Sequence, residues 1–281
     1  MTMALRLMFV LVLALGTSAC GVRLAYHHLD WLAMRWVNKQ VTLNPVQEMT
    51  FRDALEDKLD WHCANELPEY VPFLNSVTET MSEESITVAE LERVGDRVAE
   101  FGQRLIDRAM PSVVALFASL DDDQIQELLD GIDERNDEFL EERVELAPEQ
   151  RHKERVEGMQ RNLKRFIGRT SEAQNQRLEQ WADSLLFVAP RMHVHQRLWR
   201  DQLAVLLAER HQDETFGPAL TELFQPAADW PNDFRAVMAI NRQRTLEALV
   251  DIHASLSARQ KRRLLDRIDS LSSDFEGLSC G

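Results

Sequence analysis

The sequence predicts an all-α protein, an irregular helical bundle of about ten helices. Apolar residues recur every three or four positions through most of the chain, as on one face of an amphipathic helix. The period-two alternation of a half-buried strand is nearly absent. The nine prolines fall mostly between the periodic stretches, where a missing N–H is tolerated. These observations predict helices joined by short, proline-marked turns.

The first twenty residues have the composition of a bacterial lipoprotein export signal. Arg6 precedes the apolar run Leu7–Leu15, and small residues lead from there to Cys20. The run is too short for a membrane span, which needs about 20 apolar residues, and fits a cleaved signal peptide. We therefore expect residues 1–19 to be removed and Cys20 to become a lipidated N-terminus. The alternative is an ordinary signal peptide cut near Ala19, with Cys20 an incidental thiol.

Residues 20–281 are predicted to form a single periplasm-facing all-helical domain. Beyond the leader, no apolar run is long enough for a second membrane span. The formal net charge of −15 argues against nucleic acid as a partner, because phosphate binding requires clustered Lys and Arg. Gly21, rather than Asp, follows Cys20. The sorting rule for Gram-negative lipoproteins then predicts the periplasmic leaflet of the outer membrane, held by the lipid anchor.

With Cys20 lipidated, Cys63 and Cys280 remain as an even pair in an oxidising compartment. This predicts a disulfide that ties the C-terminal end to an early helix. The alternative is that Cys63 is a small buried residue and Cys280 a free thiol.

A membrane-proximal helix is predicted at residues 22–40, directly after the lipidation site. Helical spacing puts Ala25, Leu29, Leu32 and Trp36 on one stripe. The stripe either docks into the domain core or contacts the membrane. In the second case Tyr26, Trp31 and Trp36 would lie at the lipid headgroup layer, because amphipathic aromatic rings favour that depth.

The remaining predicted helices follow the apolar periodicity. They are expected at 45–65, 69–82, 87–119 with a kink or break near Pro111, 121–145, 148–168, 171–188, 191–211, 232–255 and 257–271. Two apolar faces support these bounds. One comprises Val156, Met159, Leu163, Phe166 and Ile167, and the other comprises Leu198, Trp199, Leu203, Leu206 and Leu207.

A short pattern recurs at the predicted helix starts. It begins at Leu43, Leu120, Leu146, Thr170 and Leu256, and each copy ends in Gln four residues later. Asn44, Asp121, Ser171 and Ser257 can cap the first turn, while the Gln at the third helical position reaches back to the cap backbone. In addition, residues 120–133 align without gaps to 256–269. The pattern indicates recurrent helix starts or a distant internal duplication.

Charge is unevenly placed along the chain. Residues 121–145 carry twelve acids and two arginines, whereas 149–169 carry seven basic residues and three acids. These helices could be solvated, or could pair with each other through complementary faces. The alternative is that a basic set contacts phosphates of anionic lipid or lipopolysaccharide. The candidates are Arg161, Lys164, Arg165 and Arg169, or Arg259, Lys261, Arg262 and Arg263.

The N-terminal region resembles a known family. The matching positions are Arg23, Leu24, Tyr26, Asp30, Trp31, Arg35, Trp36, Leu43, Pro45, Gln47, Trp61, His62, Leu67, Pro68 and Tyr70. This pattern is similar to the N-terminal signature of the bacterial lipoprotein family DUF6279, most strongly over about residues 15 to 75. The resemblance implies an all-helical lipoprotein, and it implies no catalytic residue or ligand.

The usual catalytic and metal-binding patterns are missing from the sequence. It contains no Gly-x-Ser-x-Gly elbow, phosphate-binding glycine loop or His-Glu-x-x-His pattern. His193 and His195 are two residues apart, which points them to different helix faces and makes a poor metal chelate. The run Asp121-Asp122-Asp123 falls at a helix start, where acids favour the dipole. We predict no catalytic residue, metal or cofactor.

The leading functional hypothesis is a nonenzymatic outer-membrane lipoprotein that acts as a helical scaffold or binding module for a periplasmic or envelope protein. The first alternative is a chaperone-like role, because the helix starts resemble the Leu-Thr-x-x-Gln signature of small periplasmic chaperones of the Spy type. The second is an enzyme acting on envelope polymers, which requires a cleft with convergent carboxylates or a His pair.

Overall fold

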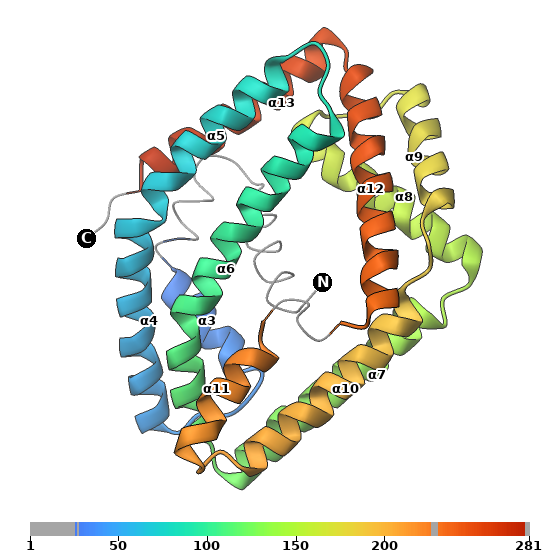
Figure 1. Ribbon diagram of the computed structural model, residues 1–281. Coiled ribbons are helices and arrows are strands. Elements are labelled where there is room, and N and C mark those ends of the chain that lie inside the picture. The colour runs from blue at the N-terminus through green and yellow to red at the C-terminus, as the bar shows by residue number, and fades with distance from the viewer. Residues whose placement is uncertain (1–25, 27, 226–229, 279–281) are drawn as a thin grey trace.

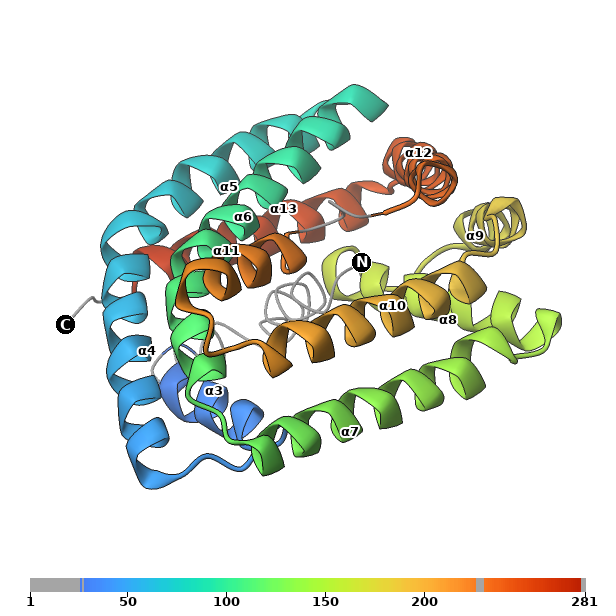
Figure 2. The same cartoon turned by 60° about the horizontal axis from the view of Figure 1, so that its bottom comes forward.

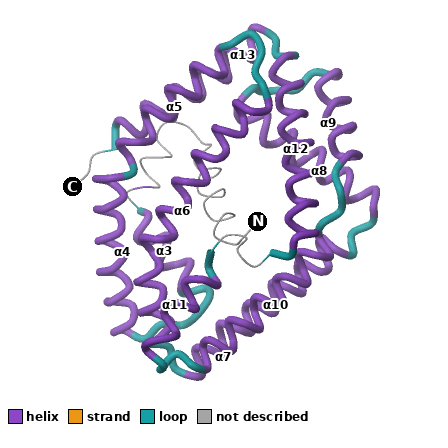
Figure 3. The backbone as a smooth tube through the Cα atoms, viewed as in Figure 1, coloured by secondary structure: helices purple, strands orange, loops and turns teal. Residues whose placement is uncertain are grey.

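The computed structural model describes residues 26, 28–225 and 230–278. This part of the chain holds eleven α-helices, one short π-helix and no strand (Figure 3), which confirms the all-α prediction. The predicted signal peptide, Cys20 and Cys280 lie outside the described residues, as do residues 22–25 of the predicted membrane-proximal helix. The division into a leader and a single domain therefore stays a prediction.

The helices have the following bounds. They are α3 (Leu29–Val37), α4 (Pro45–Asn65), α5 (Leu67–Ser82), α6 (Val88–Ala118), α7 (Asp122–Phe139), the π-helix η1 (Leu140–Val144), α8 (Pro148–Phe166), α9 (Glu172–Ser184), α10 (Ala189–Ala208), α11 (Asp213–Leu223), α12 (Asn232–Ala254) and α13 (Ala258–Glu276).

The helices lie around a four-sided frame (Figure 1). The α5/α13 pair and the α7/α10 pair form two opposite sides, and in each pair the two helices pack against each other although they are distant in sequence. Helices α3, α4, α6 and α11 lie on the left of the frame, while α8, α9 and α12 lie on the right. The rotated view of Figure 2 keeps α3 and α4 on the opposite side from α8 and α9.

Buried apolar side chains of the described residues form four clusters, of which two are large. The main core joins α6, α7, α10 and α11, where Leu207 and Leu220 have no exposed surface. The second core joins α8, α9 and α12 around Leu178 and Ala248, each 1% exposed. Burying one such leucine side chain stabilises the fold by about 1.5–3 kcal/mol, so these cores fix the relative positions of the helices.

Most predicted helices are observed, and α4 has the predicted bounds. Of the kink or break expected near Pro111, the break does not occur: α6 continues through Pro111 as one helix. Proline removes one backbone hydrogen bond and crowds the preceding turn. Here Met110, 4% exposed, and its neighbour Val113 pack into the main core on both sides of Pro111, and this packing keeps the helix continuous.

Helix α11 was not predicted, and α13 ends five residues later than predicted. Gly217 and Pro218 both have low helix propensity, but Phe216 and Leu220 are spaced for one helical face and both are buried. The last turn of α13 forms because Phe275 packs edge-on against Tyr70, with ring centroids 5.3 Å apart.

Gln47 and Gln124 join the starts of α4 and α7 in what we call the first glutamine junction. Each closes a capping box with its own N-cap, Asn44 or Asp121, as predicted. The two amides also bond each other, with Gln47 Nε2 to Gln124 Oε1 at 3.0 Å and Gln124 Nε2 to Gln47 Oε1 at 2.7 Å. A residue that caps its own helix therefore also binds a second helix start.

The second glutamine junction repeats this scheme at the starts of α9 and α13. Gln174 and Gln260 close capping boxes with Ser171 and Ser257, again as predicted. Gln260 Nε2 donates to Gln174 Oε1 at 2.9 Å, and Gln174 Nε2 donates to Gln260 Oε1 at 3.3 Å. The same arrangement of two capping boxes joined by two bonds between glutamine amides thus occurs twice in the described residues.

The two junctions belong to an internal structural repeat. Helix α4 packs on α6 as α9 packs on α12, and α5 packs on α13 as α10 packs on α7. The helices α6 and α12, which contact each other, end at the C-caps Ser119 and Ser255. In each junction a glutamine of the neighbouring helix donates to that serine's carbonyl, Gln47 to Ser119 and Gln174 to Ser255. The recurrent helix starts therefore also mark equivalent positions of two similar halves.

Candidate functional site

Helix α3 is amphipathic and docks on α4 through only part of its circumference. Met34 and Val37 are its buried residues, 6% and 7% exposed. Trp31, Leu32 and Trp36 remain 54%, 40% and 38% exposed. The buried face is therefore not the predicted stripe, since Leu32 and Trp36 of that stripe are exposed. We call Trp31, Leu32 and Trp36, together with Arg35 and Lys39, the α3 surface.

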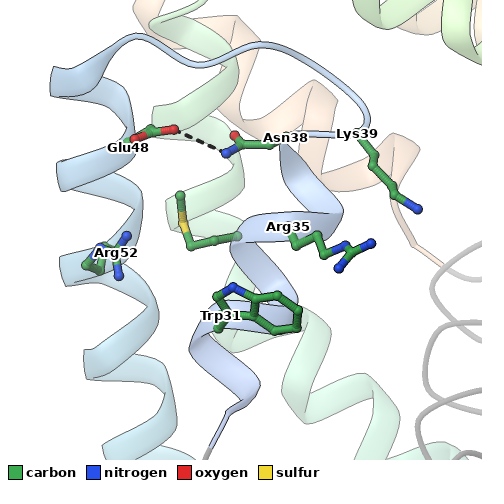
Figure 4. Close-up of a pocket in the computed structure, with 7 residues that line it drawn as sticks. Trp31, Arg35, Asn38, Lys39, Glu48 and Arg52 are labelled. Atoms are coloured by element: carbon green, nitrogen blue, oxygen red, sulfur yellow. Dashed lines mark hydrogen bonds between the residues drawn. The ribbon is translucent and has the colours of Figure 1, made fainter.

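A hollow of about 500 Å³ lies between α3 and α4 beside this surface (Figure 4). It is lined by Trp31, Met34, Arg35, Asn38, Lys39, Glu48 and Arg52. Arg35 lies with its guanidinium carbon 5.4 Å from the Trp31 ring centre, a cation–π arrangement. Glu48 accepts a hydrogen bond from Asn38 Nδ2 at 3.1 Å. Three cations thus line the hollow against a single carboxylate.

Tyr26 does not lie with the exposed tryptophans. Its hydroxyl is 3.2 Å from His62 Nδ1, and the Nε2 atom of that ring is 3.0 Å from the Tyr70 hydroxyl. Burial lowers the pKa of His62 and raises the pKa values of Tyr26 and Tyr70, so all three groups are neutral near pH 7. This chain of hydrogen bonds ties the segment before α3 to α4 and α5, and it gives these signature residues a structural role.

Glu66 forms a bidentate ion pair next to this chain of hydrogen bonds. Glu66 is 2% exposed, and its carboxylate accepts two hydrogen bonds from Arg104, at 2.8 and 2.7 Å. A bidentate pair of this kind is short and directional. It fixes the corner between α4 and α5 against α6, so it supports the fold.

Cys63 is buried, 6% exposed, and is disulfide-bonded. It packs in a small cluster with Leu67 and Leu278. Leu278 is two residues from Cys280, so the described part of the chain brings the C-terminal end close to Cys63. Cys280 itself lies outside the described residues, and the predicted Cys63–Cys280 pairing stays a prediction.

The predicted basic set on α8 is divided by the structure. Arg161, Lys164 and Arg169 line a hollow of about 460 Å³, whereas Arg165 does not. The other lining residues are Glu157, Gln160, Gly168, Thr170 and Asn175. We call this hollow the α8–α9 pocket. The contribution of Asn175 to this pocket was not predicted, because Asn175 lies on the next helix, α9.

Gly168 shapes the loop between α8 and α9. Its φ of +80° lies in the left-handed region that favours glycine. A Cβ atom there would lie 3.2 Å from Nη1 of Arg263, which reaches across from α13. The glycine therefore allows a cation from the second predicted basic set to approach the pocket formed by the first.

The acidic segment pairs with a different helix from the one considered in the sequence analysis. α7 packs against α10, where Arg200 Nη2 lies 2.6 Å from Asp133 Oδ2, and α8 packs against α9. Asp121 caps α7, as predicted, and Asp122 accepts a hydrogen bond from the buried Arg210 at 2.7 Å. The acids of α7 therefore pair with arginines of α10, which lies along α7 on the same side of the frame.

Among the described residues, no group of three or more His, Cys, Asp or Glu side chains could hold a metal ion. His195 contacts the rings of Trp230 and Phe234. His152 lies between two carboxylates of α9, 2.5 Å from Glu179 and 3.0 Å from Asp183. The sequence analysis missed this contact because it depends on how α8 and α9 pack.

The fold and these surfaces define an all-helical protein with basic hollows. Residues 39–235 match DUF6279, a family of unknown function, and the chain belongs to this family. The match includes the α8–α9 pocket and begins just after α3. No curated protein and no solved structure matches the chain. Among the described helices, none is both long and apolar enough to cross a membrane.

Proposed function

We propose that this protein is a nonenzymatic lipoprotein of the outer membrane, a helical binding module that lies with its α3 surface in the lipid headgroup layer. The observation that carries the proposal is the exposure of Trp31, Leu32 and Trp36 on one short helix that also bears Arg35. Exposed apolar side chains in a group mark an interaction surface.

The covalent anchor limits what this surface can contact. Leu29 is nine residues after Cys20, and nine residues span at most about 30 Å when fully extended. If Cys20 carries lipid, α3 therefore starts within a short distance of the membrane. A lipid surface is then the nearest partner for exposed tryptophans, whose rings favour the interface between acyl chains and water.

The charges beside the tryptophans support the same orientation. Arg35, Lys39 and Arg52 line the hollow between α3 and α4 with only Glu48 opposing them. A basic residue close to an anionic membrane surface contributes about 1 kcal/mol. The protein as a whole is acidic, so this local excess of cations favours one face for the membrane and leaves the rest of the frame exposed to a periplasmic partner.

The positions of the perturbed groups favour binding over catalysis. The residues with shifted pKa values, including His62 and Tyr70, lie in the ion pairs, caps and buried contacts of the fold, and none lines the two hollows described above. The paired glutamines are likewise accounted for by helix capping. The recurrent helix starts thus add no support of their own to a chaperone-like role.

Fluorescence quenching of the full lipidated chain tests the orientation. The protein is reconstituted into vesicles of phosphatidylcholine and phosphatidylglycerol that carry brominated acyl chains. We expect bromine to quench the emission of two of the six tryptophans, and the double variant Trp31→Phe/Trp36→Phe to lose this quenching. Trp199→Phe is the control, because that indole donates to Leu223 O inside the fold.

Unchanged quenching in the double variant would overturn the proposed membrane contact. The anchor is tested separately by fractionating cells that express Cys20→Ala. We expect this variant to leave the membrane fraction for the soluble periplasm, and retention in the outer membrane would contradict lipid anchoring through Cys20.

A further inference from the structure

The α8–α9 pocket is a basic site on an acidic protein. Arg161, Lys164 and Arg169 line it, and Glu157 is its one carboxylate. The chain has a formal net charge of −15, so most of its surface repels anions. A local excess of cations here therefore indicates selection for a negatively charged group at this position.

These cations are little used by the fold. Glu157 is shared between Lys153 at 3.9 Å and Arg161 at 3.7 Å, both long for an ion pair. Lys164 and Arg169 have no ion-pair partner among the described residues. By contrast, Arg177 and Arg200 approach carboxylates of other helices to 2.6 Å. Two cations that stay unpaired in an acid-rich chain remain available for an external anion.

One uncharged side chain of the pocket, that of Asn175, also presents a donor. Asn175 Oδ1 accepts hydrogen bonds from Gln160 Nε2 at 3.0 Å and from Thr170 Oγ1 at 2.6 Å. The acceptor atom of Asn175 is thereby occupied, while its NH₂ group has no acceptor among the described residues. Arg263 lies against the Gly168 backbone at the edge of the pocket and adds a further cation.

We propose that the α8–α9 pocket binds a phosphate monoester. A phosphate accepts hydrogen bonds in several directions, which suits a lysine, two arginines and an amide that converge from different elements. The volume of about 460 Å³ exceeds the space that a bare phosphate fills and has the size of a small-molecule site. The phosphate is therefore attached to a larger polar body, either a soluble compound or a lipid headgroup.

This site is separate from the α3 surface. Helices α3 and α8 lie on opposite sides of the frame in both views (Figures 1 and 2). Phosphate binding in the α8–α9 pocket therefore does not depend on whether the α3 surface contacts the membrane.

Calorimetric titration of the full chain in detergent tests the proposal. The probes are inorganic phosphate, glucose 1-phosphate and dihexanoyl phosphatidate below its micelle concentration. Glucose is the uncharged control. We expect saturable binding of at least one phosphate ester, and about tenfold weaker binding in each of Lys164→Gln and Arg169→Gln, because each removes one charge-assisted hydrogen bond.

Arg165→Gln is the matched control, since it removes the same charge from the adjacent position of α8 but does not line the pocket. We expect its affinity to stay within about twofold of the wild type. All three positions are exposed, so the variants should keep the helix content and melting temperature of the parent chain.

The outcomes separate the two ligand sources. Binding of glucose 1-phosphate assigns the pocket to a soluble ester, and binding of dihexanoyl phosphatidate alone assigns it to a lipid headgroup. Equal losses of affinity in Arg165→Gln and Lys164→Gln would show that general charge attraction causes the binding, and would overturn the proposed site. Absence of saturable binding for all three phosphate probes would also overturn it.

Discussion

The two halves of the frame contain equivalent hollows that are lined by different side chains. In the first half, α3 precedes α4 and the hollow lies between them. In the second, α8 precedes α9 in the same way. In both, the residue after the junction glutamine lines the hollow and accepts a hydrogen bond from an amide of the preceding helix. These acceptors are Glu48, bonded by Asn38, and Asn175, bonded by Gln160.

The two hollows differ in the types of residue that line them. The first includes Trp31 and adjoins the exposed Leu32 and Trp36, whereas the lining of the second is polar or charged throughout apart from Gly168. One repeated architecture therefore offers a surface suited to a lipid interface on one side and a surface suited to a polar anion on the other.

The junctions behind the hollows differ in their apolar cover, although Gln174 of the second junction is only 1% exposed. Leu43 and Leu120, which open the two helix starts of the first junction, are 7% and 2% exposed and belong to the main core. In the second junction Thr170 replaces leucine and lines the pocket, while Gln260 is half-buried. The second junction thus keeps the hydrogen bonds of the first but gives up part of its apolar cover, and this exposure makes room for the pocket.

The largest loss in the free energy of unfolding is expected when a buried glutamine of the first junction is removed. Gln124→Ala removes both bonds between the two amides and the bond to the Thr42 carbonyl, in a site that water does not reach easily. We expect a loss of about 3 kcal/mol in the free energy of unfolding. Urea unfolding of the full chain, followed by circular dichroism, measures it.

Gln126→Ala serves as the matched control for this prediction. It lies on the same helix, is exposed and bonds only Asp130 one turn away. A loss there comparable to that of Gln124→Ala would show that helix propensity, and not the junction, determines the result.

Gly168→Ala tests the left-handed glycine, which occurs in the second half and, among the described residues, not in the first. The left-handed φ of +80° and the 3.2 Å approach of Arg263 both oppose a Cβ atom. We expect a loss of about 1–2 kcal/mol in urea unfolding. The change should also weaken any anion binding in the α8–α9 pocket, because Arg263 must move.

The control for this change is Gly158→Ala in the middle of α8. A Cβ atom there meets only Arg161, at an ordinary 3.8 Å, so alanine should stabilise the helix by about 0.5–1 kcal/mol. Opposite signs at the two glycines are expected, and a stabilising effect at Gly168 would contradict the strained loop.

Gln260→Ala should have a smaller effect than Gln124→Ala. Gln260 bonds the Arg169 carbonyl at 3.1 Å and Gln174 at 2.9 Å, but it is half-buried, so water can replace part of these contacts. We expect a loss of about 1 kcal/mol in the same urea assay. Equal losses at Gln260 and Gln124 would remove the distinction between a closed and an open junction.

Much of the local structure could be predicted from sequence, because its causes are local. The caps Asn44, Asp121, Ser171 and Ser257 were predicted from residues within one helical turn, and the structure confirms all four. The pairing of the glutamines could not be predicted. It joins positions 77 and 86 residues apart, and nothing within one turn specifies which helix starts meet.

The same limit explains the errors at the surface. Leu198 was expected on a buried face with Leu203, yet it is 55% exposed, because α10 buries a narrower stripe than the apolar spacing suggests. The basic residues of α8 were predicted as a surface, but sequence could not separate Arg165 from Lys164. That distinction depends on the loop at Gly168 and on Asn175 of the next helix.

The smallest effect is expected at the copy of the pattern that forms no junction. The pattern beginning at Leu146 places Ala147 at the N-cap, which has no capping side chain, and Gln150 bonds only Glu154 of its own helix at 3.3 Å. Gln150→Ala should therefore change the unfolding free energy by less than about 0.5 kcal/mol. Ala147→Ser adds the missing cap and should stabilise α8 by about 0.5–1 kcal/mol in urea unfolding. A large loss of unfolding free energy in Gln150→Ala would mean that this glutamine stabilises the fold without a partner on another helix. The effects at Gln124 and Gln260 would then be due to helix capping alone and not to the pairing of helix starts.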